Sequence, residues 1–259
     1  MSADGTGGAG APVWPAGVGR VLLPEVDSTN AEAARRAAEG AGPTWILAGF
    51  QTDGRGRRGR AWVSPRGNFH ATLLDRPQGP PERVALLSFA AALALREALA
   101  TLTGAGAAFT LKWPNDVLLN GGKVAGILLE SSGAGGRIEH LCIGIGVNLI
   151  AAPDPGDLEP GALRPVSLLA ETGLRIEPAR LLDHLAPAFA HWSGRLAAGG
   201  FAPLRAAWLD HAARLGETIR ARTGTETVSG TFETLDDGGA LILRTAQGRR
   251  AIPAADVFF

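Results

Sequence analysis

The chain has 259 residues, of which 46% are hydrophobic and 19% charged, which suits one large globular domain with a small appended module. Its 25 basic and 25 acidic residues cancel, which excludes an overall electrostatic attraction to nucleic acid or to an anionic membrane. The single cysteine, Cys142, excludes an intramolecular disulfide framework and favours a reducing compartment, so we predict a cytoplasmic protein.

Hydrophobic periodicity and turn residues divide the chain into predicted elements. In chain order they are a disordered tail over residues 1–16, a strand over 20–24, a helix over 31–39, strands over 45–50 and 68–74, a helix over 83–103, strands over 109–113, 117–119, 124–129 and 138–149, and helices over 178–198 and 202–214. The most hydrophobic segment, residues 84–102, is interrupted by Arg96 and Glu97, so it predicts an amphipathic or buried helix and no membrane span. From residue 216, short runs rich in Thr, Val and Ile predict a small all-β module.

This order of elements predicts an α+β body, with helices packed on a mixed or antiparallel sheet, followed by the β module. The first helix begins after a polar Ser-Thr-Asn sequence. Ser28 or Thr29 is therefore the predicted N-cap, and Glu32 would complete a capping box.

A loop of glycine and arginine follows the second predicted strand. Residues 54–60 contain four guanidinium groups and three glycines. Glycines let backbone N–H groups approach a ligand closely, and arginines donate paired hydrogen bonds to phosphate or carboxylate. The same composition is typical of a flexible basic tip that contacts RNA or only water, so both interpretations stay open. The loop is not a Walker loop, because no Gly-Lys-Ser or Gly-Lys-Thr ends it.

A predicted hairpin occupies the middle of the chain, with Asn120-Gly121 as a two-residue turn. With that turn, Leu118 pairs with Lys123 and Asp116 pairs with Ala125, so alternation places the charges of Lys123 and Asp116 on one face of the sheet. The alternatives are a solvated lysine beside a turn, and ordinary capping roles for the asparagine and aspartate that follow Pro114.

Glycines inside two predicted strands indicate places where a ligand or another backbone comes close. They are Gly126 and the two glycines of Gly-Ile-Gly-Val-Asn at residues 144–148. The second block is not a Rossmann fingerprint, because it lacks the third glycine and the following helix.

Taken in order, these blocks resemble the biotin–protein ligase family. They are Ser-Thr-Asn at 28–30, Gln-Thr-Asp-Gly-Arg-Gly-Arg-Arg-Gly-Arg at 51–60, Lys-Trp-Pro-Asn-Asp at 112–116, Lys-Val-Ala-Gly-Ile-Leu at 123–128 and Gly-Ile-Gly-Val-Asn at 144–148. The resemblance is dense over residues 20–150 and looser elsewhere. It implies a class II synthetase-like catalytic domain on a seven-stranded mixed sheet, over residues 17–212, and an SH3-like β-barrel over residues 213–259.

The resemblance further implies an enzyme that adenylates biotin with ATP and passes it to a lysine of a biotin carboxyl carrier protein or domain. Implied contacts to biotin come from Ser28, Thr29, Asn30, Gln51, Gly54, Arg55, Gly56, Arg57, Trp62, Lys123 and Gly126. Implied contacts to ATP or the adenylate come from Arg57, Arg58, Arg60, Lys112, Asn115, Asp116, Lys123 and Asn148. Mg²⁺ would accompany the triphosphate, through protein ligands that the sequence does not identify.

Three of these residues, Lys123, Arg57 and Asp116, are expected to be catalytic. A biotin carboxylate that attacks the α-phosphorus approaches another anion, and their repulsion at 4 Å costs roughly 4 kcal/mol at an effective dielectric near 20. The resemblance implies that Lys123 lies between the two anions, and that Arg57 belongs to a loop that covers the adenylate. Asp116 is the expected acceptor of the proton from the attacking carrier lysine.

Two other functions compete with this one. Lipoate–protein ligases and octanoyl transferases share the fold, but use an Arg-Arg-x-Ser-Gly-Gly-Gly type of loop, so residues 54–60 favour biotin. A non-catalytic nucleic-acid binder disagrees with the zero net charge and with the lack of a recognised DNA module. About 20 residues precede the catalytic pattern, too few for a helix-turn-helix domain, so we expect the short form of the family, with no specific DNA binding and no membrane partner.

Overall fold

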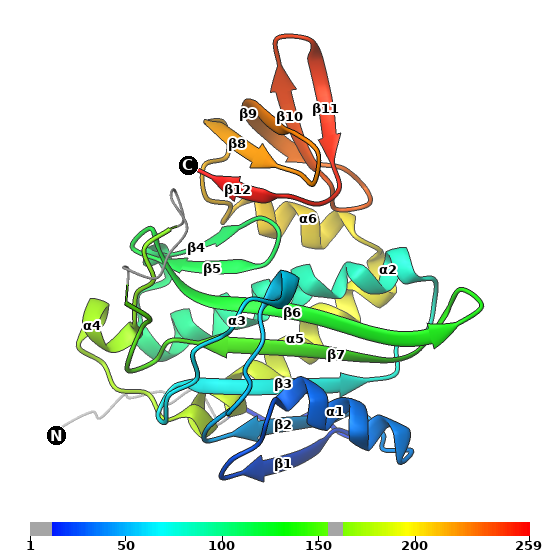
Figure 1. Ribbon diagram of the computed structural model, residues 1–259, viewed down its shortest axis with the longest axis vertical. Helices are drawn as coiled ribbons and strands as arrows, with labels where there is room; N and C mark the ends of the chain where they lie inside the picture. Colours follow the sequence, from blue (N-terminus) through cyan, green and yellow to red (C-terminus); the bar gives the residue numbers. More distant parts are fainter. Residues whose placement is uncertain (1–11, 155–162) are drawn as a thin grey trace, which may run out of the picture.

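The computed structural model describes residues 12–154 and 163–259, so the first eleven residues of the predicted tail lie outside the described part. Its centre is a seven-stranded sheet in the order β1-β2-β3-β7-β6-β5-β4 (Figure 1). The strands are β1 Gly19–Leu23, β2 Thr44–Ala48, β3 Phe69–Asp75, β4 Phe109–Lys112, β5 Asp116–Leu119, β6 Gly122–Ala134 and β7 Arg137–Val147. β1 and β2 are parallel and every other neighbouring pair in this sheet is antiparallel, which confirms the predicted α+β fold with a mixed sheet.

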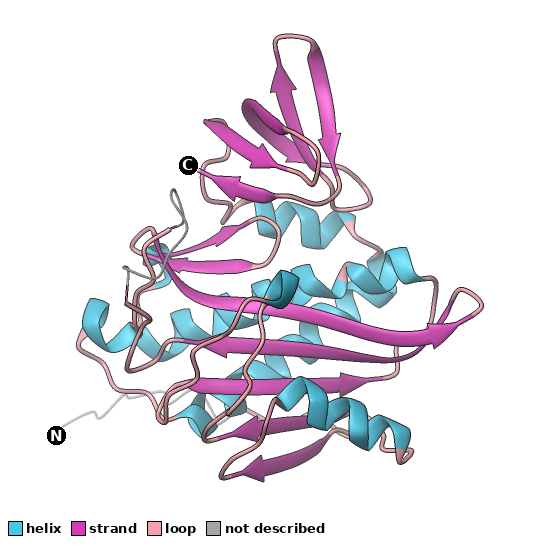
Figure 2. Ribbon diagram, viewed as in Figure 1, coloured by secondary structure: helices cyan, strands magenta, loops and turns pink. Residues whose placement is uncertain are grey.

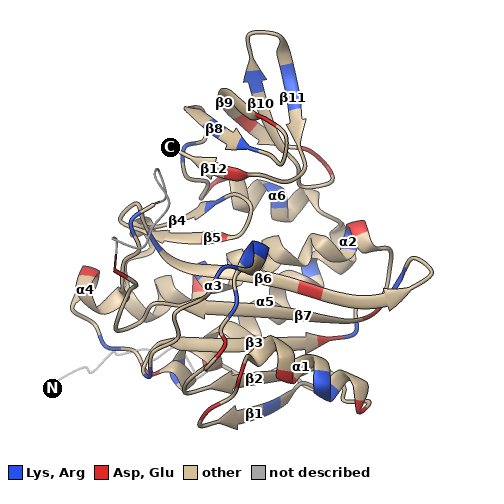
Figure 3. Cartoon of the chain, viewed as in Figure 1, with Lys and Arg blue, Asp and Glu red and all other residues tan. Residues whose placement is uncertain are grey.

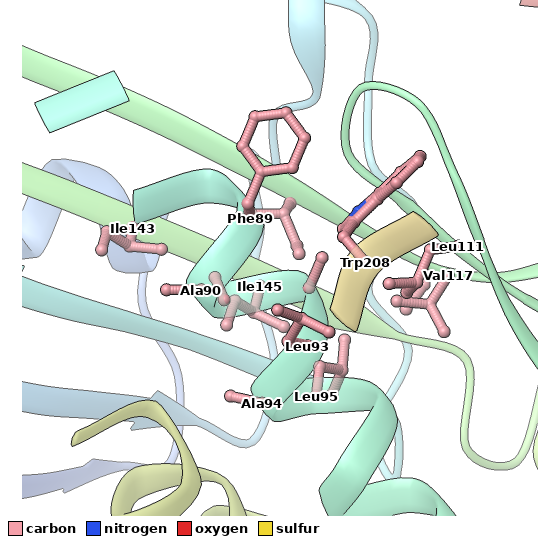
Figure 4. Close-up of a cluster of buried hydrophobic side chains, with 14 of the residues drawn as sticks. Phe89, Ala90, Leu93, Ala94, Leu95, Leu111, Val117, Ile143, Ile145 and Trp208 are labelled. Carbon is pink, nitrogen blue, oxygen red and sulfur yellow. The ribbon is translucent and has the colours of Figure 1, made fainter. Parts of the chain in front are cut away.

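Helices cover both faces of the sheet (Figure 2). They are α1 Thr29–Ala38, α2 Pro81–Ala85, α3 Leu87–Thr103, α4 Leu168–Thr172, α5 Pro178–Gly199 and α6 Ala202–Leu209. On one face, the buried side chains of Ile143 and Ile145 pack with Ala90 and Leu93 of α3 (Figure 4). On the other face, α1 packs against a smaller group that includes Cys142. Because successive side chains along each strand point to opposite faces, the sheet contributes to two separate cores. The polar sequence blocks lie on the face that α1 covers.

The core helix differs from its prediction at one end. Residues 83–103 were predicted as one helix, whereas α2 and α3 are separate, with Leu86 between them. α3 ends at Gly104, whose φ of 70° is the left-handed conformation expected of a terminal glycine. The segment Pro81–Thr103 has the length and apolarity of a membrane span, but 67% of its most apolar window is buried inside the molecule, as in a core helix.

The start of α1 corrects one local prediction. Ser28 occupies the N-cap position, but its side chain makes no capping hydrogen bond, and the carboxylate of Glu32 accepts from Arg35 and Arg36 instead. The predicted capping box is therefore wrong. Arginines one turn later offer the carboxylate charged donors, which bind it more strongly than a single backbone N–H group would.

The predicted strands 124–129 and 138–149 form one long hairpin, β6 and β7, that turns at Gly135 and Gly136 with φ of 61° and 75°. The hydrophobic pattern ends near Leu129 because the far half of β6 is exposed, so hydrophobicity carried no signal for it. α6 ends at Leu209, five residues earlier than predicted.

The last part of the chain is a five-stranded antiparallel sheet in the order β11-β10-β9-β8-β12, which confirms the small β module. Its strands are β8 Thr218–Arg222, β9 Thr227–Leu235, β10 Leu241–Thr245, β11 Gly248–Ile252 and β12 Asp256–Phe258. The module is packed onto the body, because the ring of Trp208 in α6 contacts Phe232, with centroids 6.4 Å apart, and the indole of Trp113 donates a 2.9 Å hydrogen bond to Gly239 O. This packing brings β12 beside the body (Figure 1).

Candidate active site

A cavity of about 680 Å³ lies on the α1 face of the sheet. Its wall comes from the start of α1, the glycine–arginine loop, strands β4 to β7, and the segment Ala255–Phe258 of the β module. Figure 3 shows the basic turn Arg57–Gly59 in front of the sheet, on the side of the β module. The cavity therefore receives side chains from both parts of the chain.

One end of the cavity is lined by uncharged polar side chains that contact one another. The backbone N–H of Thr29 donates to Gln51 Oε1 at 2.8 Å, and Gln51 Nε2 donates to Ser64 Oγ at 2.9 Å. The buried hydroxyl of Thr72 lies 2.6 Å from Asn30 Oδ1 and 2.8 Å from Thr29 Oγ1. These contacts hold donors and acceptors in fixed positions, as recognition of a small polar ring requires.

The indole of Trp62 rests on bare backbone at this end. A Cβ atom on Gly146 would come within 2.5 Å of Trp62 Nε1, and one on Gly126 would lie 3.3 Å from Cζ3 of the same ring. The next glycine along β7, Gly144, makes room in the same way for the amide of Asn30. Trp62 Nε1 is buried and has no hydrogen-bond partner among residues 12–154 and 163–259, so this donor is left unsatisfied beside the cavity wall.

The other end of the cavity gathers positive charge around one carboxylate. Lys123 Nζ lies 2.7 Å from Asp116 Oδ1, and Lys112 Nζ lies 3.5 Å from Asp116 Oδ2. These are the only two lysines in the sequence, in which the other 23 of 25 basic residues are arginines. Arg57 joins them from the basic loop and donates a 3.3 Å hydrogen bond to Asn115 Oδ1.

The hairpin that carries this cluster contains a β-bulge. Leu118 pairs with Lys123 as predicted, but Asp116 pairs with Gly126, so the predicted pairing with Ala125 is wrong. The extra residue in β6 lets both Val124 and Ala125 turn into the core, where each is fully buried. Lys123 and Asp116 nevertheless form a direct ion pair, so the prediction that they share one face is confirmed.

Burial and charge act together on the titration of this cluster. Burial alone would raise the pKa of Asp116, but the ammonium groups of Lys123 and Lys112 lower it below its usual value. Burial lowers the pKa of Lys112, against the opposing effect of Asp116. Burial also lowers the pKa of Arg57, although a guanidinium stays charged at neutral pH. The positive charges around the ionised carboxylate of Asp116 therefore outnumber its single negative charge, and this excess of positive charge suits an anionic ligand.

Asp256 of β12 anchors the basic loop from the opposite side. Its Oδ2 atom lies 2.6 Å from Arg58 Nη1, 3.4 Å from Arg60 Nη2 and 3.3 Å from Arg222 Nη2. Burial would raise the pKa of Asp256, but the hydrogen bond from Arg222 and the charges of the loop arginines lower it. The β module thus supplies the carboxylate that opposes the mutual repulsion of the loop arginines.

Most of the predicted site residues line this one cavity. They are Ser28, Thr29, Asn30, Gln51, Arg55, Gly56, Arg57, Arg60, Trp62, Lys112, Asn115, Asp116, Lys123, Gly126 and Asn148. Gly54 lies behind the wall, where a Cβ atom would come within 2.5 Å of Trp62 O, and Arg58 turns away towards Asp256.

Sequence reasoning missed several residues of the wall. They are Val63, Pro153, Leu163, Pro165, Ala255, Asp256, Val257 and Phe258. Lys112 and Lys123 were predicted, and the scarcity of lysine is a further signal for them, because two lysines among 23 arginines suit positions where a compact ammonium group is needed. Asp256 had no comparable signal, because only the packing of the β module brings it to the loop.

The close contact between Trp62 and the glycines of β6 and β7 leads to a testable prediction. Gly146→Ala should weaken binding of biotin, the ligand that the resemblance implies for this end, by about tenfold or more, because the new methyl group displaces the Trp62 indole from its place. The readouts are the KM for that ligand and the tryptophan emission spectrum. Gly194→Ala in α5, where nothing lies within 4 Å of the added Cβ, is the matched control. An unchanged KM for Gly146→Ala would show that the contact between Gly146 and Trp62 does not shape the binding site.

Comparisons with known proteins agree with this geometry. Residues 22–148 match the Biotin/lipoate A/B protein ligase family, and residues 215–259 match the Biotin protein ligase C terminal domain. The chain is 59% identical to a biotin–[acetyl-CoA-carboxylase] ligase from Paracoccus denitrificans, over 92% of this chain and 99% of that protein. It is 34% identical to the bifunctional ligase/repressor BirA of Bacillus subtilis, over 92% of this chain and 73% of that protein.

Solved structures give the same answer. A biotin protein ligase from Aquifex aeolicus, in complex with biotin and ATP, superposes with a TM-score of 0.77 at 27% identity, over 92% of this chain and 97% of that one. The chain therefore belongs to the biotin/lipoate A/B protein ligase family and, within it, to the biotin–protein ligases.

Proposed function

We propose that this protein activates biotin with ATP to biotinoyl-5′-AMP and transfers the biotinoyl group to a lysine of a biotin carboxyl carrier protein or domain. The observation that carries the proposal is the division of the cavity. A neutral end of fixed donors and acceptors adjoins an end with three cations around Asp116. A ureido ring with an acidic tail suits the first end, and a nucleotide suits the second.

At the neutral end, the ureido group of biotin offers one acceptor and two donors. Gln51 retains one N–H after its hydrogen bond to Ser64, and the indole N–H of Trp62 lacks a partner among the described residues. Ser28, Thr29 and Asn30 complete this wall. Arg55 and Gly56 line the same cavity.

At the cationic end, the first half-reaction joins two anions. A carboxylate oxygen of biotin attacks the α-phosphorus of ATP, the bond to the bridging oxygen breaks, and diphosphate leaves. Lys123 and Arg57 supply the positive charge that offsets the repulsion during the approach. Asn148 is suited to the adenine amino group, because its buried Oδ1 atom has no partner among the residues that the structure describes.

In the second half-reaction, the amine of the carrier lysine attacks the acyl carbon of the mixed anhydride, AMP leaves and an amide forms. The neutral amine must lose one of its two protons as the amide forms. Asp116 is placed to accept one, but its lowered pKa makes it a weak base. Its main task in the proposed mechanism is to hold the ammonium groups of Lys112 and Lys123 in position.

Mg²⁺ would arrive with the triphosphate. Within residues 12–154 and 163–259, no group of three or more His, Cys, Asp or Glu side chains is arranged to hold a metal ion. Asp116 and Asp256 are engaged with cations. Phosphate oxygens and water therefore supply most of the Mg²⁺ ligands in this proposal, as is usual for nucleotide-bound magnesium.

Incubation with labelled biotin, ATP and an isolated biotin carboxyl carrier domain tests the proposal. The expected result is label on the carrier that requires ATP and resists hydroxylamine, because an amide has formed. Label from lipoate or octanoate in place of biotin would show that the chain has the activity of the other branch of the family. No labelled carrier with any of the three acids would overturn the transfer step.

Some relatives are named as bifunctional ligase/repressors, but we expect this chain to bind no specific duplex DNA. Its net charge is zero, so the nonspecific attraction that precedes operator recognition is weak. A gel shift with random and promoter-derived duplexes at physiological salt is the measurement. A sequence-specific shift that survives this salt would contradict the expectation.

A further inference from the structure

We propose that Glu130, on β6 beside the cavity, is a positioning residue that fixes the side-chain amide of Asn30 in one of its two orientations and so sets the hydrogen-bonding pattern that the biotin ring meets. The inference rests on the proposed function, because it takes biotin as the occupant of the neutral end. It extends that function by a residue outside the cavity wall.

The side chains around Asn30 have too few hydrogens for all of their close polar contacts to be hydrogen bonds. Asn30 Oδ1 lies 2.6 Å from the Thr72 hydroxyl, the two threonine hydroxyls lie 2.8 Å apart, and the Thr29 hydroxyl lies 3.0 Å from Gln51 Oε1. Neither amide oxygen carries a hydrogen, so the two hydroxyl hydrogens must serve three contacts.

A flipped Asn30 would remove the conflict. Its Nδ2 atom would donate to Thr72, the Thr72 hydroxyl would donate to Thr29, and the Thr29 hydroxyl would donate to Gln51. All three contacts would then contain a hydrogen. The local hydroxyl chain by itself therefore favours the orientation opposite to the one observed.

Glu130 supplies the reason for the observed orientation. Asn30 Nδ2 donates to Glu130 Oε2 at 2.6 Å, a short hydrogen bond to a charged acceptor. In the flipped orientation, the amide oxygen of Asn30 would face the carboxylate with no hydrogen between them. Because a charge-assisted hydrogen bond is about twice as strong as a neutral one, the carboxylate prevails over the hydroxyl chain.

The orientation matters to the ligand because Asn30 lines the cavity. The Asn30 amide packs on Gly144. Two residues further along β7, on the same face of the sheet, the unpartnered N–H of Trp62 packs on Gly146. With Glu130 present, one N–H of Asn30 Nδ2 is held by the carboxylate, and its second N–H is left as a further donor for the ligand, in addition to those of Gln51 and Trp62. A cluster of donors suits the ureido oxygen of biotin.

The test compares Glu130→Gln with a matched control, Glu139→Gln, which removes the same charge from another exposed position, on the neighbouring strand β7. Glutamine keeps the size of Glu130 but donates as readily as it accepts, so Asn30 is free to flip. We expect the Kd for biotin to rise about tenfold in Glu130→Gln, the usual effect of one misdirected hydrogen bond, with the KM for ATP unchanged. Glu130→Asp, which keeps the anion, should recover part of the affinity, and Glu139→Gln should bind like the wild type.

A second ligand separates orientation from a general loss of structure. Iminobiotin carries a donor where biotin has the ureido oxygen, so the flipped amide should accept from it, and the preference for biotin over iminobiotin should narrow in Glu130→Gln. Equal weakening of both ligands, or biotin affinity within twofold of the wild type, would overturn the proposal. A wild-type protein that binds no biotin would overturn the proposed function as well, whereas normal wild-type binding with an unaffected variant would overturn this inference alone.

Discussion

Lys123→Ala is expected to reduce biotinoyl-adenylate formation by about 10²–10³, the usual cost of removing one group that stabilises a developing anion. Lys123 Nζ lies in the cavity wall, 2.7 Å from Asp116 Oδ1 and 5.7 Å from the centre of the Trp62 ring, between the neutral and the cationic ends. In the proposed mechanism it is the cation between the biotin carboxylate and the α-phosphate. Biotin-dependent exchange of labelled diphosphate into ATP measures this step without a carrier protein.

A second substitution separates charge from geometry. Lys123→Arg keeps the charge, but its planar guanidinium does not reproduce a compact ammonium group, so it should recover only a small part of the rate. Both variants should retain the wild-type melting temperature within a few degrees, because the Lys123 side chain is 32% exposed and its loss leaves Lys112 on the carboxylate. If Lys123→Ala exchanged labelled diphosphate into ATP at nearly the wild-type rate, Lys123 would have no catalytic role beyond its ion pair with Asp116.

Arg57→Gly is expected to form the adenylate but to hold it poorly, so that activated biotin labels lysines on unrelated proteins. Arg57 lines the cavity and is tied to Asn115 by one long hydrogen bond, which leaves most of its donors for a phosphate. Loss of a charge-assisted contact to a ligand typically costs about 1.5–3 kcal/mol, or roughly 10- to 100-fold in retention. Labelling of serum albumin, present as a bystander, provides the readout, and the two cavity lysines of the enzyme contribute little background.

The same loop offers a matched control. Arg58 adopts φ of 57°, so glycine is conformationally tolerated there, and its guanidinium points to Asp256 and not into the cavity. Arg58→Gly should therefore leave the bystander nearly unlabelled. Equal labelling by both variants would mean that loop flexibility, and not the Arg57 contact, controls retention.

The sequence predicted the parts of the site that depend on local geometry. The turn at Asn120-Gly121 placed Lys123 opposite Leu118, and the shared face of Lys123 and Asp116 followed from alternation. The bulge at Val124 escaped prediction because it results from packing, since both Val124 and Ala125 are accommodated in the core.

Contacts between distant segments were beyond reach of the sequence patterns. The glycine–arginine loop was interpreted either as an anion-binding loop or as a flexible basic tip, and neither interpretation includes its ion pair with Asp256, which lies 198 residues after Arg58. Glu130 was missed for a similar reason, because it lies just past an apolar motif and acts through a contact with Asn30, 100 residues away. Sequence periodicity indicates which face a residue takes, but not which segment the fold brings against it.

In the proposed function, one cavity activates biotin at the expense of ATP, and adenylate formation that depends on biotin is the direct test. The purified chain, with α-labelled ATP, Mg²⁺ and biotin but no carrier, should produce labelled biotinoyl-AMP, which hydroxylamine converts to biotin hydroxamate and labelled AMP. Omission of biotin, or its replacement by lipoate or octanoate, should abolish the product. Labelled AMP that forms at the same rate without biotin, or an adenylate that forms with lipoate and not with biotin, would rule out this function.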